Sequence, residues 1–123
     1  MNLILEIVNR EMAAIGINYH LMMATNPVYP YFTCEPSEND FSFEENRTQG
    51  QLLIEGWTRN SWAELFAAKN KIKKHFAEYQ TVENGEAIYI DYLSSIPIRT
   101  GEAELKKIQI ILEFKTWELD ENI

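Results

Sequence analysis

The spacing of hydrophobic positions changes at Gly16, from the period of a helix to the period of a strand. Apolar residues three and four positions apart lie on one face of a helix. Before Gly16 they form one such stripe, made of Leu3, Ile4, Ile7, Val8, Met12 and Ile15. Glycine suits the left-handed cap that ends many helices, and Ile17 is placed to fold back on the last turn. We therefore predict a helix over residues 2–15, with Asn2 as its N-cap.

After Gly16 apolar and polar residues alternate, as they do in half-buried strands. Strands are predicted over 17–23, 28–34 and 51–57. Pro30 indicates an edge position or an irregular start for the second of them. Phe41 and Phe43 alternate with polar residues, so strand pairing is expected to resume there, and 45–50 is typical of a loop or hairpin tip.

The clearest helix signal begins at Ser61. Ser61-Trp62-Ala63-Glu64 matches a capping box, in which the serine hydroxyl accepts the Glu64 amide and the glutamate reaches back. A helix is predicted over 62–79, with Trp62 and Phe66 anchoring it to the sheet. Its later half carries four basic side chains, where cations suit the helix dipole: Lys71, Lys73, Lys74 and His75.

Two further strands are predicted over 87–93 and 105–118, with turns at Asn84-Gly85 and Thr100-Gly101 and a break at Ile96-Pro97-Ile98. The resulting order is α-β-β-β-α-β-β. Short links between consecutive strands favour antiparallel pairing. We predict an α+β fold of two layers, in which a mainly antiparallel sheet of about five strands carries two helices on one face. Residues 1–123 form a single domain with a frayed tail at 120–123.

Composition agrees with one cytoplasmic globular domain. The chain has 123 residues, 46% hydrophobic and 24% charged, which is ordinary for such a protein. A single cysteine excludes an internal disulfide. The net charge of −8 disfavours both nucleic acid, whose affinity comes mostly from Lys and Arg, and anionic membranes. The apolar start lacks the positive residues of a signal peptide, and no stretch reaches the ~20 apolar residues of a membrane span.

The sequence offers little for catalysis. His20 and His75 fall on different elements and in no zinc-binding pattern, and Cys34 has no second cysteine. A Cys34 nucleophile beside a histidine in space stays an alternative to a half-buried strand cysteine. We expect no catalytic, cofactor-binding or metal-binding residues, and hence no enzyme. A small enzyme with an unrecognised site remains a third hypothesis.

The most distinctive polar stretch runs from residue 35 to residue 45. It holds five acids and no base: Glu35, Glu38, Asp40, Glu44 and Glu45. It lacks the spacing and the glycine of a calcium loop. A solvated protruding loop and an acidic contact surface both remain open. Within the 35–50 segment Phe41 and Phe43 are candidate protein-contact anchors, and Arg47, Arg59 and Arg99 are candidate partners for carboxylates across an interface.

Several short motifs occur in one order along residues 15–118. They are Gly-Ile-Asn-Tyr at 16–19, Tyr-Pro-Tyr-Phe at 29–32, Glu-Gly-Trp-Thr-Arg at 55–59, Ser-Trp-Ala-Glu-Leu at 61–65 and Phe-Lys-Thr-Trp-Glu at 114–118. Together they resemble the small tail-terminator or tail-completion proteins of long-tailed phages and prophages. The 35–50 segment departs from that pattern.

The resemblance implies a structural protein that forms a ring, commonly of six subunits, at the head-proximal end of the tail tube. Its expected partners are further copies of itself, the tail tube protein and the neck protein, and it would enter the virion after assembly in the bacterial cytoplasm. The acidic charge would let DNA pass through such a ring. A hypothesis from another class is a small acidic inhibitor or immunity-type protein that uses its carboxylates to bind a basic protein.

Overall fold

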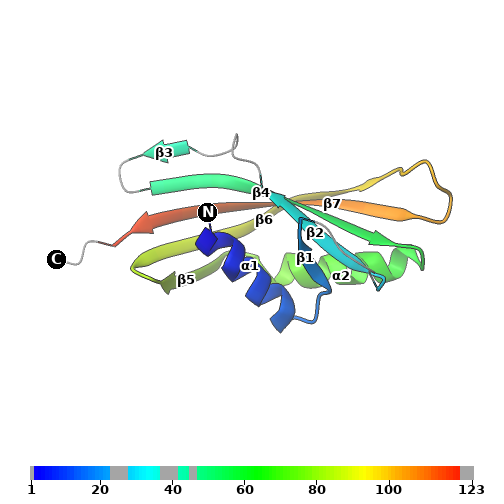
Figure 1. Cartoon of the computed structure of the whole chain (residues 1–123), viewed down its shortest axis with the longest axis horizontal. Helices are drawn as coiled ribbons and strands as arrows, with labels where there is room; N and C mark the ends of the chain where they lie inside the picture. The colour runs from blue at the N-terminus through cyan, green and yellow to red at the C-terminus, as the bar shows by residue number, and fades with distance from the viewer. Residues whose placement is uncertain (1, 23–27, 37–41, 45–46, 120–123) are drawn as a thin grey trace.

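The computed structural model describes residues 2–22, 28–36, 42–44 and 47–119, which form two helices and a seven-stranded sheet (Figure 1). The helices are α1 (Asn2–Ala14) and α2 (Trp62–His75). The strands, in chain order, are β1 (Tyr19–Leu21), β2 (Tyr31–Pro36), β3 (Ser42–Glu44), β4 (Arg47–Thr58), β5 (Tyr79–Glu83), β6 (Glu86–Ile98) and β7 (Lys106–Glu118).

The sheet runs in the order β1-β2-β4-β7-β6-β5, and β3 pairs with β4 beside this path. Every pairing is antiparallel except the parallel pair of β1 and β2. The last strand, β7, lies at the centre between β4 and β6. The mainly antiparallel α+β prediction is confirmed, and the short strands β3 and β5 add to the five expected strands.

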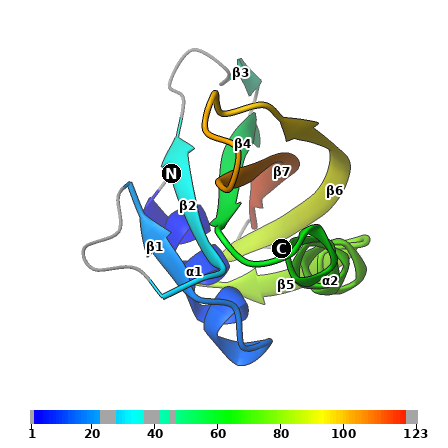
Figure 2. The same cartoon turned by 90° about the vertical axis from the view of Figure 1, so that its right-hand side faces the viewer.

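Both helices cover the same face of the curled sheet (Figure 2). Ile7 and Met12 of α1 and Ile72 of α2 belong to one buried cluster with Ile110 and Phe114 of β7. The even-numbered positions of β7 from Ile108 to Thr116 are all buried, so this face of the strand supplies the floor of the core. The two-layer arrangement with both helices on one face is therefore confirmed.

Helix α1 ends as its sequence predicts. Gly16 takes φ of +76°, in the left-handed region. The Ile17 amide donates to the Met12 carbonyl (2.9 Å) and the Gly16 amide to the Ala13 carbonyl (3.1 Å). This pair of hydrogen bonds is the Schellman motif, and it satisfies carbonyls that the helix end leaves free.

Helix α2 begins at the predicted cap and ends earlier than predicted. The Glu64 amide donates to the Ser61 hydroxyl (3.1 Å), whereas the Glu64 carboxylate accepts from the Thr58 hydroxyl (3.0 Å) instead of reaching back to Ser61. The predicted extension to residue 79 is wrong. The helix ends at His75, and Glu78 takes φ of +54°, which turns the chain into β5. Residues 79–82, Tyr-Gln-Thr-Val, include three residue types that favour strands, and they form β5.

The buried stripe of α2 consists of Leu65, Ala68 and Ile72 and continues to Phe76 beyond the helix. Trp62 is 38% exposed, so it does not anchor the helix in the core as expected. Its ring stacks on Phe66 at 5.5 Å between centroids, on one side of the stripe. Phe66 packs only partly buried against the core.

The Asn84-Gly85 turn is confirmed as the tight link between β5 and β6, with φ of +51° and +75°. The predicted break at Ile96-Pro97-Ile98 is wrong, because β6 continues to Ile98 opposite β7. A register shift between Tyr92 and Ser94 marks a bulge. Since β5 pairs with β6 only as far as Ile90, Pro97 lies where one side of β6 has no paired strand in the described sheet, a position that proline tolerates.

Candidate assembly surfaces

The face of the sheet away from the helices carries both polar and aromatic side chains. Glu55 of β4 forms an ion pair with Lys107 of β7, directly beside it in the sheet. The Lys107 ammonium lies 4.5 Å from the centre of the Trp57 ring, and Trp57 stacks on Tyr31 of β2 at 6.4 Å. At this end of the outer face the charges are therefore paired within the subunit.

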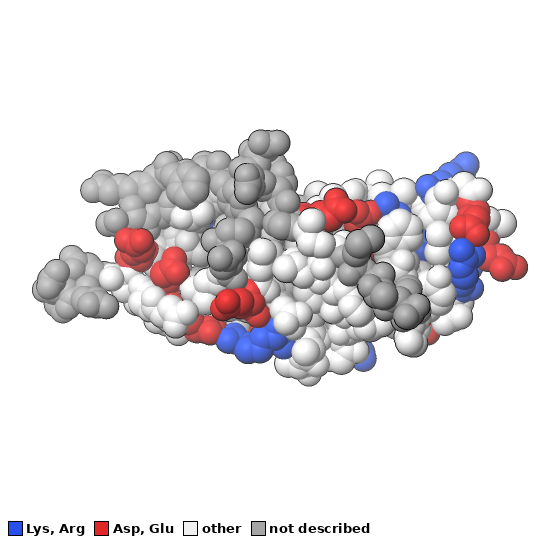
Figure 3. Space-filling model, viewed as in Figure 1, with Lys and Arg blue, Asp and Glu red and all other residues white. Residues whose placement is uncertain are grey.

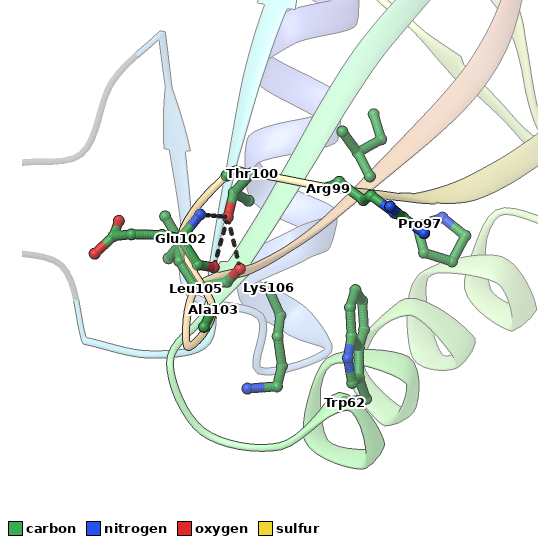
Figure 4. Close-up of a pocket in the computed structure, with 10 residues that line it drawn as sticks. Trp62, Pro97, Arg99, Thr100, Glu102, Ala103, Leu105 and Lys106 are labelled. Atoms are coloured by element: carbon green, nitrogen blue, oxygen red, sulfur yellow. Dashed lines mark hydrogen bonds between the residues drawn. The ribbon is translucent and has the colours of Figure 1, made fainter.

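One end of the molecule carries an open cavity of about 600 Å³, between the start of α2 and the turn from β6 to β7 (Figure 4). Trp62 of α2 and Lys106 of β7 face this opening. Pro97 and Leu105 add apolar surface, and Arg99 brings a cation to the rim. The Trp62 cavity, as we call it, thus combines an exposed aromatic ring with apolar walls and basic side chains.

The turn that closes the Trp62 cavity is held by Thr100. Its hydroxyl lies 2.9 Å from the Leu105 carbonyl oxygen and 3.0 Å from the Glu102 carbonyl oxygen, and it accepts the Glu102 amide at 3.1 Å (Figure 4). Gly101 takes φ of +83°, so the turn depends on glycine at this position. Hydrogen bonds within the turn therefore fix the rim of the Trp62 cavity in the single subunit.

The basic side chains at this end differ in how they are paired. Arg59 forms an ion pair with Glu102 at 3.0 Å. Neither Arg99 nor Lys106 has a carboxylate at ion-pair distance within the described residues, and the Lys106 ammonium donates to the Glu104 carbonyl oxygen at 3.2 Å. Figure 3 shows both blue and red groups at this end of the molecule. Arg99 and Lys106 are therefore available to carboxylates from outside.

The predicted interface residues fall at two ends of the molecule. Phe41 lies outside the described residues. Phe43 is the middle residue of β3, and Arg47 begins β4 opposite Glu44. For these residues the structure describes the backbone and not the side chains. Arg59 and Arg99 lie beyond the other end of β4, which spans roughly 35 Å at ~3.3 Å per residue. The structure therefore places Arg59 and Arg99 together and far from Phe43 and Arg47 (Figure 1).

Cys34 and His20 lie on opposite faces of the sheet. Cys34 pairs in register with Leu21, so alternation along β1 puts His20 on the opposite face of the sheet. His20 instead contacts the Asn18 side chain at 3.0 Å. Burial raises the pKa of the Cys34 thiol to about 11, which disfavours the reactive thiolate. Among the described side chains there is no group of three or more metal-ligating residues.

His75 belongs to a polar network that ties α1 to the far edge of the sheet. Its ring lies 2.9 Å from the Glu11 carboxylate, and Arg10 binds Glu83 of β5 through two contacts of 2.6 and 2.8 Å. Burial raises the pKa of Glu11, but hydrogen bonds from His75 and Arg10 outweigh it and leave that pKa below its usual value. The Arg10 guanidinium likewise lowers the pKa of Glu83. These contacts place His75 in a network that joins α2, α1 and β5.

Sequence reasoning missed the Trp62 cavity because it assigned Trp62 to the core. The spacing of Leu65, Ala68 and Ile72 puts Trp62 and Phe66 at the margin of the buried stripe, and this spacing could have indicated that Trp62 is exposed.

No helix among the described residues is both long and apolar enough to span a bilayer.

Comparisons with known proteins add one finding about the fold. No protein-family model matches the chain, and no curated protein matches it at a significant level. Among solved structures, the chain is similar to a chain from the virion of a native gene transfer agent particle, with a TM-score of 0.68. That likeness covers 86% of this chain and 83% of the other at 14% identity. The two chains therefore share a fold.

Proposed function

We propose that this chain is a structural protein of a phage-type virion. The observation that carries the proposal is the fold shared with a chain of a gene transfer agent virion over 86% of this chain's length. The order of motifs that resembles tail terminators points independently to the same class of particle. The proposal makes the chain a non-enzymatic component of the virion.

Within that class we propose the role of tail terminator. The chain forms a ring at the head-proximal end of the tail tube, stops tube growth and offers a surface to the neck. Its partners are further copies of itself, the tube protein and the neck protein. A ring needs two different contact surfaces on each subunit, and the Trp62 cavity lies at the end of this elongated molecule opposite β3 (Figure 1). The acidic charge of −8 per subunit suits a channel through which DNA passes without binding.

Self-association tests the proposal in solution. Because each subunit carries −8, mutual repulsion opposes closure, and salt screens it over a Debye length of about 8 Å at physiological strength. We expect native mass spectrometry and sedimentation to find monomers at low concentration and one closed oligomer, most simply a hexamer, as protein concentration and salt rise. A chain that stays monomeric throughout and binds a basic protein one to one would favour an acidic inhibitor instead.

A further inference from the structure

We propose that the Trp62 cavity receives the acidic segment 35–45 of a neighbouring copy of this chain. The inference rests on the proposed function, because it names the contact through which subunits of the ring would join. It assigns the receiving surface to the end that carries the Trp62 cavity, and the donor to a segment whose described β3 part lies at the other end (Figure 1).

The receiving surface has the chemistry of a pocket for an aromatic side chain beside a carboxylate. Trp62 is 38% exposed in a monomer, although a tryptophan ring buries a large apolar area when it is covered. The cavity of about 600 Å³ lies within the range of pockets that enclose small ligands. Arg99 and Lys106 stand at the rim without a described carboxylate partner. An occupant that is both aromatic and acidic would cover the ring and pair with the cations.

The segment 35–45 is the part of this chain with that chemistry. It reads Glu-Pro-Ser-Glu-Asn-Asp-Phe-Ser-Phe-Glu-Glu and holds five acids, two phenylalanines and no base. Aromatic residues that fill a pocket, flanked by charged groups, are typical anchors of protein interfaces. The complementary charges would also guide the encounter and disfavour other orientations.

The geometry requires that this contact join two copies. β3 lies at one end of the long axis and the turn between β6 and β7 lies at the other (Figure 1). The length of β4, roughly 35 Å, separates Arg47 from the Arg59 end, so the β3 part of the segment cannot fill the cavity of its own subunit. A contact between two different surfaces is head-to-tail, and such a contact closes a ring when its rotation permits.

Peptide binding tests the inference without depending on ring formation. The probe is a synthetic peptide with the sequence of residues 35–45, titrated into the full chain by calorimetry. We expect saturable binding to the wild type and an affinity about tenfold lower for Arg99→Glu, because a favourable contact becomes repulsive. Lys74→Glu makes the same charge change on an exposed residue outside the cavity, so it should leave binding unchanged. A peptide with serine in place of both phenylalanines should bind more weakly than the wild-type peptide.

Self-association supplies the second readout. In native mass spectrometry and sedimentation, Arg99→Glu should form less oligomer than the wild type at the same protein and salt concentrations. Adding Glu38→Lys and Asp40→Lys to the same chain should restore the oligomer. Circular dichroism identifies variants that fail to fold. Absence of peptide binding, equal binding by Arg99→Glu and Lys74→Glu, or unimpaired oligomers from Arg99→Glu would each overturn the inference. If the chain forms oligomers but does not bind the peptide, the docking contact is wrong and the proposed ring stands. If the chain binds the peptide but forms no oligomers and does not affect tails, the proposed ring is wrong and the docking contact stands.

Discussion

Replacing Gly56 by alanine is expected to destabilise the fold by about 3 kcal/mol, at the upper end of the usual cost of overpacking. Gly56 lies in β4 between Phe32 of β2 and Ile108 of β7. A Cβ atom there would lie 2.6 Å from Cδ2 and 2.8 Å from Cζ of the Phe32 ring, which is fully buried. At these separations a Cβ cannot be accommodated as the chain stands, so the strand or the ring must shift. Urea denaturation followed by circular dichroism measures the change in the free energy of unfolding.

A double-mutant cycle separates this clash from a general effect on β4. In a Phe32→Leu background the smaller side chain leaves room for the added methyl group, so Gly56→Ala should cost clearly less there than in the wild type. Equal costs in both backgrounds, or a negligible cost in the wild type, would contradict the close approach of Phe32 to Gly56.

Phe76→Ala should cost about 3–5 kcal/mol, the range for removing a fully buried aromatic side chain. Phe76 is 0% exposed and lies directly after α2. Its ring packs against Tyr79 at 5.8 Å, and its carbonyl accepts the Tyr92 amide at 3.1 Å. The side chain therefore holds the end of the helix in the core and against the start of β5, whereas the bond to β6 comes from the backbone and remains in the variant. The loss should appear as a lower midpoint of thermal and urea unfolding.

Phe66→Ala is the matched control, because it removes the same side chain from the margin of the same helix. Phe66 is only partly buried and stacks on the exposed Trp62, so its loss should cost about 1–2 kcal/mol. If Phe66→Ala proved as costly as Phe76→Ala, the assignment of the buried stripe to Leu65, Ala68, Ile72 and Phe76 would be wrong.

Local patterns predicted most of the elements and failed where distant contacts decide. The period of apolar residues and Gly16 located α1 and its cap, and Asn84-Gly85 located the β5–β6 turn. The predicted helix ran past His75 to residue 79 because Phe76 continues the helical stripe, and residues 80–83 of β5 were assigned to no element. The central position of β7 depends on pairing between segments far apart in sequence, which no local spacing encodes.

The surfaces were predicted less completely than the fold. Sequence patterns pointed to the acidic segment and to Arg99 separately, but not to Trp62 beside Arg99, because that neighbourhood arises from the turn between β6 and β7 meeting the start of α2. The resemblance to tail terminators suggested a ring, and the separation of the two ends suggests how subunits would meet. The opposite ends of β4 explain why Arg47 and Arg59, close in sequence, belong to different surfaces.

Tail morphology in the absence of this chain tests the central claim most directly. Its coding sequence is deleted from the genome that encodes it, and particles are examined by negative-stain electron microscopy, with the wild-type chain supplied in trans as the control. The account predicts tails of uncontrolled length without attached heads, and recovery of uniform, joined particles when the chain is restored. Complete particles with tails of normal length in the deletion strain would contradict it.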